Sequence, residues 1–180
     1  MNRFLLLIGL FSTFYYANAQ VAIGKANIST NSVSLEFGNI ANNADFQRGI
    51  LLPWVTSVND IANATPGTLV FDTTDKKIKY LKGGATPVWF DLTLGSNGTV
   101  DTSLQDALIS NNKAKVSIGE NNSGADGILV LEDTNKAMVL PLVDSYKSIE
   151  NPSPGMMAYD VSNNMLCVFN GTQWTFWKEN

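Results

Sequence analysis

The chain has 180 residues, with 12 Lys and Arg against 16 Asp and Glu, a formal net charge of −4, and no histidine. Without histidine the chain cannot build a Ser-His-Asp or Cys-His catalytic site, or a His-ligated zinc or iron site, from its own residues. The acidic balance, without a basic stripe, argues against nucleic-acid binding. The one cysteine, Cys167, cannot form an internal disulfide, so packed apolar surface must supply stability.

Residues 1–19 have the pattern of an export signal. Arg3 supplies a positive start, the apolar run Phe4–Tyr16 follows, and Ala17–Ala19 is a small-residue cleavage site. These features predict a signal peptide and a mature chain that begins at Gln20. The apolar run is shorter than the ~20 residues of a membrane-spanning helix, and no later segment is apolar enough. We therefore expect an exported protein without a membrane span, in the periplasm, at the outer-membrane surface or outside the cell.

An internal duplication organises the remaining chain. Residues 48–53 align with residues 136–141, and residues 66–72 align with residues 154–160, each pair being 88 residues apart. The spacing is constant until the glycines that precede the last tryptophan-containing segment of each copy. A building unit used twice favours a binding or assembly protein over a single-site enzyme.

The duplication predicts two tandem modules, the first module at residues 20–93 and the second module at residues 116–180, with a linker at 94–115. Each should open with a short strand that ends at a glycine, continue with a second strand and a nearly continuous apolar third strand, and finish in a three-stranded antiparallel meander. In the first module these segments are residues 21–23, 32–37, 49–55, 69–72, 78–82 and 89–92. The fold class is therefore mainly β.

Alternation along the first two meander strands identifies the core. Leu69, Phe71, Ile78 and Tyr80 fall on one face of the hairpin, and their counterparts 88 residues later are also apolar. The opposite face is mixed in the first module and more apolar in the second. That second apolar face, together with the continuous third strand, predicts surface that the two modules leave uncovered.

The linker contains one possible helix. Ser103-Leu104-Gln105-Asp106 resembles a capping box, and Leu104, Ala107 and Leu108 would share one helical face. A helix shorter than ~12 residues needs a partner surface to persist. We expect at most this short helix between the modules.

The duplicated motifs resemble the tail-fibre-like repeats common in secreted proteins of Bacteroidetes. In those repeats a V-G-I-G opening precedes G-[IF]-L-x-P-R, a P-x-x-G-x-[ML]-V-[YF]-[DN] strand and a closing N-G-x-x-W. The match falls on residues 21–24, 49–53, 66–89 and 165–174. These motifs consist of packing and turn residues, which specify architecture better than activity. The resemblance implies a β-rich stalk, fibre or adhesin module, often oligomeric, on an outer membrane or exported surface.

Four residues are candidate contacts with a partner or a ligand. Trp54 and Leu142 stand where the related repeats have arginine, which indicates that both positions are covered. Cys167 occupies the place of Lys79 within a strand and is interpreted as a small buried side chain or as a thiol at a subunit interface. Trp177 lies in an end segment with aromatic rings on both strand faces, so it is a candidate for an exposed contact.

Two acidic patterns are possible sites. Residues 72–75 contain two aspartates, but the aligned residues 160–163 keep one carboxylate, which favours an ordinary turn over a calcium site. Asp72 with Asp160, or the adjacent Glu132 and Asp133, could form a carboxylate pair for glycoside hydrolysis, but their spacing does not favour it. We expect no catalytic residue, no metal ligand and no bound cofactor, and we expect that the protein is not an enzyme.

The sequence favours a non-catalytic exported structural or adhesion component. The expected partner is a second copy of the chain, with a trimer favoured, or a larger envelope or surface protein. The alternative is a carbohydrate-binding module, since flat tryptophan rings suit the apolar faces of sugars. The exposure of Trp54 and Trp177 would discriminate between these two hypotheses.

Overall fold

The computed structural model describes residues 20–38, 47–103, 106–107, 115–119, 123–125 and 127–178. The chain is mainly β, as predicted, and in the described ranges its helices are two single 3-10 turns. The predicted signal peptide lies outside these residues. So does most of the possible linker helix; of its described residues, Asp106 donates its N–H to the Thr102 carbonyl oxygen at 3.1 Å in a turn. No helix within the described ranges is long and apolar enough to span a membrane.

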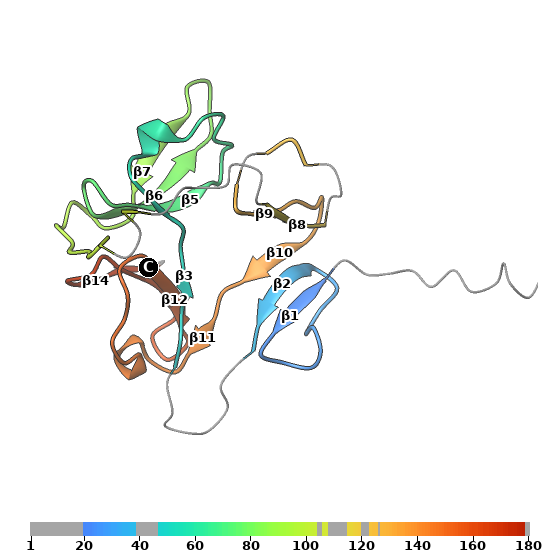
Figure 1. Ribbon diagram of the computed structural model, residues 1–180. Coiled ribbons are helices and arrows are strands. Elements are labelled where there is room, and N and C mark those ends of the chain that lie inside the picture. Colours follow the sequence, from blue (N-terminus) through green and yellow to red (C-terminus); the bar gives the residue numbers. More distant parts are fainter. Residues whose placement is uncertain are drawn as a thin grey trace, which may run out of the picture.

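The two modules contain the same elements in the same order (Figure 1). The first module comprises β1 (Val21–Ile23), β2 (Val33–Phe37), β3 (Ile50–Leu51), β4 (Trp54–Val55), η1 (Val58–Asp60), β5 (Leu69–Asp72), β6 (Lys77–Lys82) and β7 (Val88–Asp91). The second module comprises β8 (Val116–Ile118), β9 (Leu129–Leu131), β10 (Ala137–Val139), β11 (Leu142–Val143), η2 (Tyr146–Ser148), β12 (Met156–Asp160), β13 (Met165–Phe169) and β14 (Trp174–Trp177). The internal duplication is thus a structural one.

Each module ends in the predicted three-stranded meander. In the first module β5, β6 and β7 are antiparallel neighbours, and β4 adds a parallel strand to β5. In the second module β12, β13 and β14 pair in the same way, and β11 adds to β12. The registers correspond: Trp54 is opposite Phe71, and Leu142 is opposite Tyr159.

The predicted third strand is not one strand. In both modules a proline, Pro53 or Pro141, divides it into two short strands, because proline has no N–H to donate to a sheet. The proline carbonyl is still used: Pro53 accepts the N–H of Phe71 at 2.9 Å, and Pro141 accepts the N–H of Tyr159 at 3.0 Å. The segment after the proline joins its own meander. The segment before the proline pairs with the other module.

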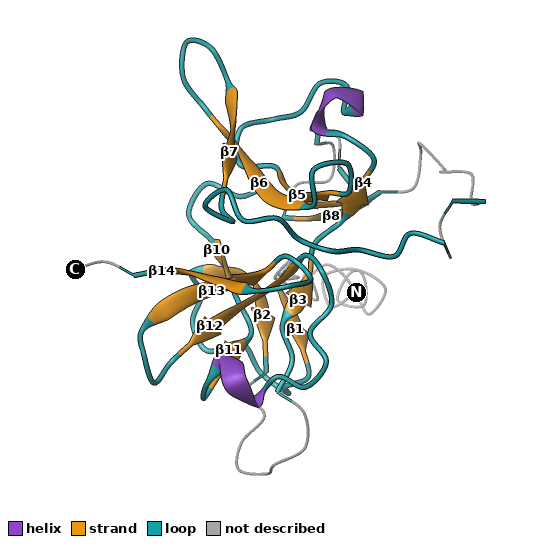
Figure 2. Ribbon diagram, turned by 90° about the vertical axis from the view of Figure 1, so that its left-hand side faces the viewer, coloured by secondary structure: helices purple, strands orange, loops and turns teal. Residues whose placement is uncertain are grey.

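The two meanders face each other across one core. In Figures 1 and 2 the β5–β7 sheet lies above the β12–β14 sheet. The buried members come from both modules and are Leu52, Phe71, Ile78, Leu92, Met157 and Val168. Leu69, Tyr80 and Leu166 pack at the border of this cluster, which confirms the predicted alternation. Because the core is shared, burial of either apolar face depends on the other module.

The second face of the second meander is covered within the chain, contrary to the sequence-based expectation. Ala158 is fully buried and packs with Val143 and Ile149, which belong to the segment that runs through β11 and η2. The turn η2 places this segment over the sheet, and Ser145 caps it by accepting the Lys147 N–H at 3.3 Å. The uncovered apolar surface lies elsewhere.

Candidate functional site

The contact between the two modules is built by strands that cross from one module to the other. β3 of the first module pairs antiparallel with β12 of the second, with Ile50 opposite Met157 and Leu51 opposite Met156. In return, β10 of the second module pairs parallel with β2 of the first. The two crossing strands, β3 and β10, occupy equivalent places in the duplicated sequence. In the structure, however, β3 pairs with a meander strand, β12, whereas β10 pairs with an opening strand, β2. The modules therefore join head to tail, not by a twofold exchange.

Two tryptophans donate hydrogen bonds across this contact, one in each direction. The Trp54 indole N–H donates to the carbonyl oxygen of Pro154 in the second module at 2.8 Å. The Trp177 indole N–H donates to the carbonyl oxygen of Leu92 in the first module at 2.9 Å. The Trp54 ring also lies 6.0 Å from that of Phe71. Both side chains are half-buried, and each uses its one polar atom inside the chain.

The segment after β7 is attached to the second module through Asn170, which is fully buried. Its amide nitrogen donates to the Ser96 hydroxyl at 2.8 Å, and its carbonyl accepts the N–H of Thr99 at 3.2 Å. The Thr99 hydroxyl donates to the carbonyl oxygen of Gly171 at 2.8 Å. Asn170 and Gly171 thus hold the start of the linker against the second module and also form their own turn. Sequence reasoning read this pair as a turn motif and missed its role across the modules.

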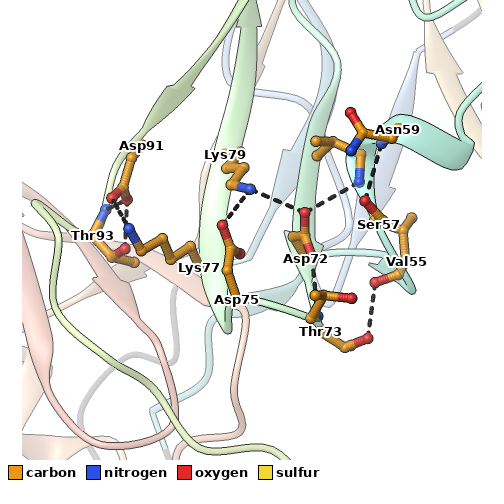
Figure 3. Close-up of polar contacts among 12 residues, drawn as sticks. Val55, Ser57, Asn59, Asp72, Thr73, Asp75, Lys77, Lys79, Asp91 and Thr93 are labelled. Atoms are coloured by element: carbon orange, nitrogen blue, oxygen red, sulfur yellow. Dashed lines mark hydrogen bonds and ion pairs between the residues drawn. The ribbon is translucent and has the colours of Figure 1, made fainter.

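Each module holds its 3-10 turn with a buried aspartate at the end of the first meander strand. Asp72 accepts the N–H of Val58 at 3.1 Å, and Asp160 accepts the N–H of Tyr146 at 3.1 Å (Figure 3 shows the first of these). Burial raises the pKa of Asp72, but hydrogen bonds from Lys79 and Val58 outweigh burial and leave the pKa lowered. Both carboxylates therefore stay ionised and serve as acceptors for the turn.

The partners of these aspartates differ between the modules. Lys79 lies 3.0 Å from Asp72 and 2.5 Å from Asp75, so the first module neutralises its carboxylate with a cation (Figure 3). The second module has Cys167 in the place of Lys79. There the Asn163 amide donates to Asp160 at 3.1 Å instead. The Cys167 thiol is fully buried, and burial together with the charge of Asp160 raises its pKa to about 11.

The acidic patterns do not gather into a site in the described part of the chain. There, no group of three or more Cys, Asp or Glu side chains is placed to hold a metal ion. In the Asp72–Asp75 turn the carboxylates are engaged by Lys79, by Val58 and by the N–H of Thr74 at 3.0 Å. This arrangement is that of a structural turn.

Within the described ranges, five of the eleven exposed large apolar side chains lie on or next to the parallel strand pairs that open each module. In the second module Val116, Ile128 and Leu129 have exposed fractions of 57%, 66% and 41%. In the first module Val21 and Ile23 are also exposed. A two-stranded sheet with an exposed apolar face is at best marginally stable in water. The β8–β9 pair therefore leaves apolar surface that a partner can cover.

Of the four predicted contact residues, two bear on the contact between modules. Trp54 and Trp177 each donate a hydrogen bond across it. Leu142 lies half-buried in β11 and pairs with β12 inside the second module. Cys167 lies inside the second module. The exposed residues of β8 and β9 were not among the candidates, because a short apolar run gives no sign of whether its sheet will be covered.

One comparison with known proteins gave a match. Residues 117–179 match the family model described as a phage tail like trimerisation region. Neither the curated proteins nor the solved structures gave a match to the chain. The matched segment runs from the second residue of β8 through β14, so the second module is similar to a phage tail like trimerisation region. The match supports tail-fibre-like β repeats in general and fits a structural, oligomerising component.

Proposed function

We propose that this protein is a non-catalytic, exported structural or adhesion component that assembles into a homotrimer. The observation that carries the proposal is the position of the exposed apolar strands β8 and β9, which lie almost entirely within the segment that matches a trimerisation region. Such a region needs apolar surface that a single chain leaves uncovered, and residues Val116, Ile128 and Leu129 supply it. A larger envelope or surface protein is the expected further partner.

Light scattering on the purified mature chain tests the assembly. We expect a mass of three chains that falls toward one chain on dilution. A single-chain mass at every concentration would contradict the proposal. N-terminal sequencing of protein recovered from the exporting cell tests the export step, and Gln20 is the expected first residue. An N-terminus at Met1 would contradict export through cleavage.

The alternative of carbohydrate binding gains no support from the two indoles. Stacking on a sugar needs a flat exposed ring, whereas Trp54 and Trp177 are half-buried and donate their N–H groups within the chain. The same mature chain can be tested on immobilised polysaccharide. Binding that Trp177→Ala abolishes would favour this alternative over a purely structural role.

A further inference from the structure

We propose that β3 of one chain pairs with the free edge of β9 in a second copy, repeating between chains the pairing that β10 makes with β2 within one chain. This inference rests on the self-association proposed above and names the contact that produces it. The template for this contact is the opening sheet of the first module, which has three strands. The opening sheet of the second module has two strands among the described residues.

The two opening sheets differ by one strand. In the first module β1 and β2 are parallel, with Val21 opposite Leu35, and β10 adds a third strand to β2. In the second module β8 and β9 are parallel in the same register, with Val116 opposite Leu129, and the sheet ends there among the described residues. Among the described residues, no strand pairs with the edge of β9 that corresponds to the β10-binding edge of β2.

The open edge of β9 presents both backbone groups and apolar side chains. Val116 donates its N–H to the carbonyl oxygen of Ile128 at 2.9 Å, and Glu132 donates its N–H to Ile118 at 3.0 Å. Successive residues of a strand direct their backbone groups to opposite edges, so Leu129 and Leu131 direct theirs away from β8. Leu129 is also 41% exposed. An unpaired apolar edge of this kind is a template for another strand.

β3 has a matching second edge. Leu52 donates its N–H to Gly155 at 3.1 Å, and Ile50 is opposite Met157, so these two residues direct their backbone groups to β12. Leu51, between them, directs its N–H and carbonyl to the other edge, and its side chain is 49% exposed. β3 can thus keep its place on β12 and accept a further strand.

The equivalence of the modules fixes the register. β10 places Met138 opposite Leu35 of β2. The residue equivalent to Met138 is Ile50, which is 88 residues earlier, and the residue equivalent to Leu35 is Leu129. The pairing between chains therefore places Ile50 of one chain opposite Leu129 of the next, with the strands parallel.

The contact is head to tail, because each chain offers one β3 and one β9. A head-to-tail contact forms a closed ring when its rotation closes and a fibre when it does not. A trimer corresponds to closure after three chains, in which every β9 edge is paired with a β3 strand.

Mixing two single-cysteine variants tests the contact. Ile50→Cys and Leu129→Cys are made separately in a Cys167→Ala background, mixed and mildly oxidised. We expect a disulfide-linked pair that contains one chain of each kind, since facing strand residues have suitable Cα separations. Leu35→Cys with Met138→Cys in one chain is the positive control for geometry, and Val88→Cys mixed with Leu129→Cys is the negative control.

Charge substitution gives an independent measurement that does not depend on disulfide geometry. Leu51→Asp and Leu129→Asp should each raise the concentration at which trimers dissociate by about tenfold or more. Val88→Asp, at another exposed apolar residue, should leave it unchanged. If the wild-type chain is trimeric but neither the cross-link nor the charge effect is seen, the β3–β9 contact is wrong while the proposed assembly stands. A wild-type chain that stays monomeric overturns both.

Discussion

Trp54 and Trp177 make the same kind of contact in opposite directions across the two modules. Each indole donates its N–H to a backbone carbonyl of the other module, Trp54 to Pro154 at 2.8 Å and Trp177 to Leu92 at 2.9 Å. Neither carbonyl is part of a strand pair there, so the indole supplies the partner that a half-buried oxygen needs.

Replacing either indole by phenyl should weaken the contact between the modules. Trp54→Phe and Trp177→Phe should each lower the free energy of unfolding by about 1–2 kcal/mol, because a carbonyl oxygen loses its donor. Trp174→Phe is the control: it removes the same atoms from a ring that packs against Tyr146 and Phe169 within the second module. Urea unfolding measures all three. Equal losses in all three variants would contradict a special role for the cross-module hydrogen bonds.

Stability should fall as the solution becomes acidic. Hydrogen bonds from Lys25 and Ser29 lower the pKa of Glu36 from 4.5 to about 2, and the pKa values of Asp72 and Asp160 are also lowered. Because each folded-state pKa lies below the unfolded value, the stabilisation is complete above about pH 4.5 and is lost as the pH falls toward 2.

The contribution of Glu36 can be isolated. Its carboxylate accepts the Lys25 ammonium at 2.5 Å and the Ser29 N–H at 2.7 Å. Glu36→Gln should make the unfolding free energy less dependent on pH between 4.5 and 2, whereas Glu150→Gln, at an exposed position, should leave the profile unchanged. Denaturant titrations at a series of pH values provide the comparison. Parallel profiles for wild type and Glu36→Gln would refute the assignment.

The Asn170-Gly171 turn should tolerate no side chain at the glycine. Gly171 has φ +95°, and a Cβ there would overlap the carbonyl oxygen of Thr99. Gly171→Ala should cost about 2–4 kcal/mol from the backbone conformation and the displaced linker together. At Gly83, its equivalent, an added Cβ would meet only the Pro66 ring at 3.2 Å, so Gly83→Ala should cost about 1 kcal/mol or less. Similar melting temperatures for the two variants would count against this role of the turn.

Cys167 should be unreactive in the folded chain. Its thiol is fully buried and its pKa is raised to about 11, so almost no thiolate exists at pH 8. A thiol reagent should modify Cys167 only at the rate of unfolding, and rapidly in denaturant. Val88→Cys, at a side chain that is 59% exposed, provides a fast-reacting control in the same chain. Immediate modification of native Cys167 would show that the thiol reaches the surface.

Local pattern predicted the meanders well, because alternation decides which side chains face a core. Phe71 and Ile78 are fully buried as their positions require. A proline within an apolar run indicates an edge position or the end of a strand, as Pro53 does after β3. The same pattern could not show which module β3 joins, since strand pairing depends on residues far away in the chain. Nor could it show that Asn170 reaches across to Ser96. The described positions of Trp54 and Trp177 likewise depend on carbonyl groups about 100 and 85 residues away.

The two crossing segments differ at their first residue, which is glycine before β3 and alanine in β10. Gly49 precedes β3, and a Cβ added there would lie 2.6 Å from the carbonyl oxygen of Met157 in β12. The equivalent residue in the second module is Ala137, the first residue of β10, which lies on β2 and not on a meander strand. An alanine at position 49 would therefore require β3 or β12 to shift, and we expect this difference to favour the place that each crossing strand takes.

Exchanging these two residues tests that explanation. Gly49→Ala should push β3 away from β12 and lower the free energy of unfolding by about 1–3 kcal/mol. Ala137→Gly removes an exposed methyl group and should cost about 1 kcal/mol or less, through backbone entropy. Thermal unfolding of both variants provides the measurement, and hydrogen exchange at the Leu52 N–H, which donates to Gly155, reports whether β3 has moved. Because β3 also carries the proposed contact with β9, Gly49→Ala should weaken assembly as well. Unchanged exchange at Leu52 in Gly49→Ala would show that β12 adjusts to the methyl group and that Gly49 does not direct the strand.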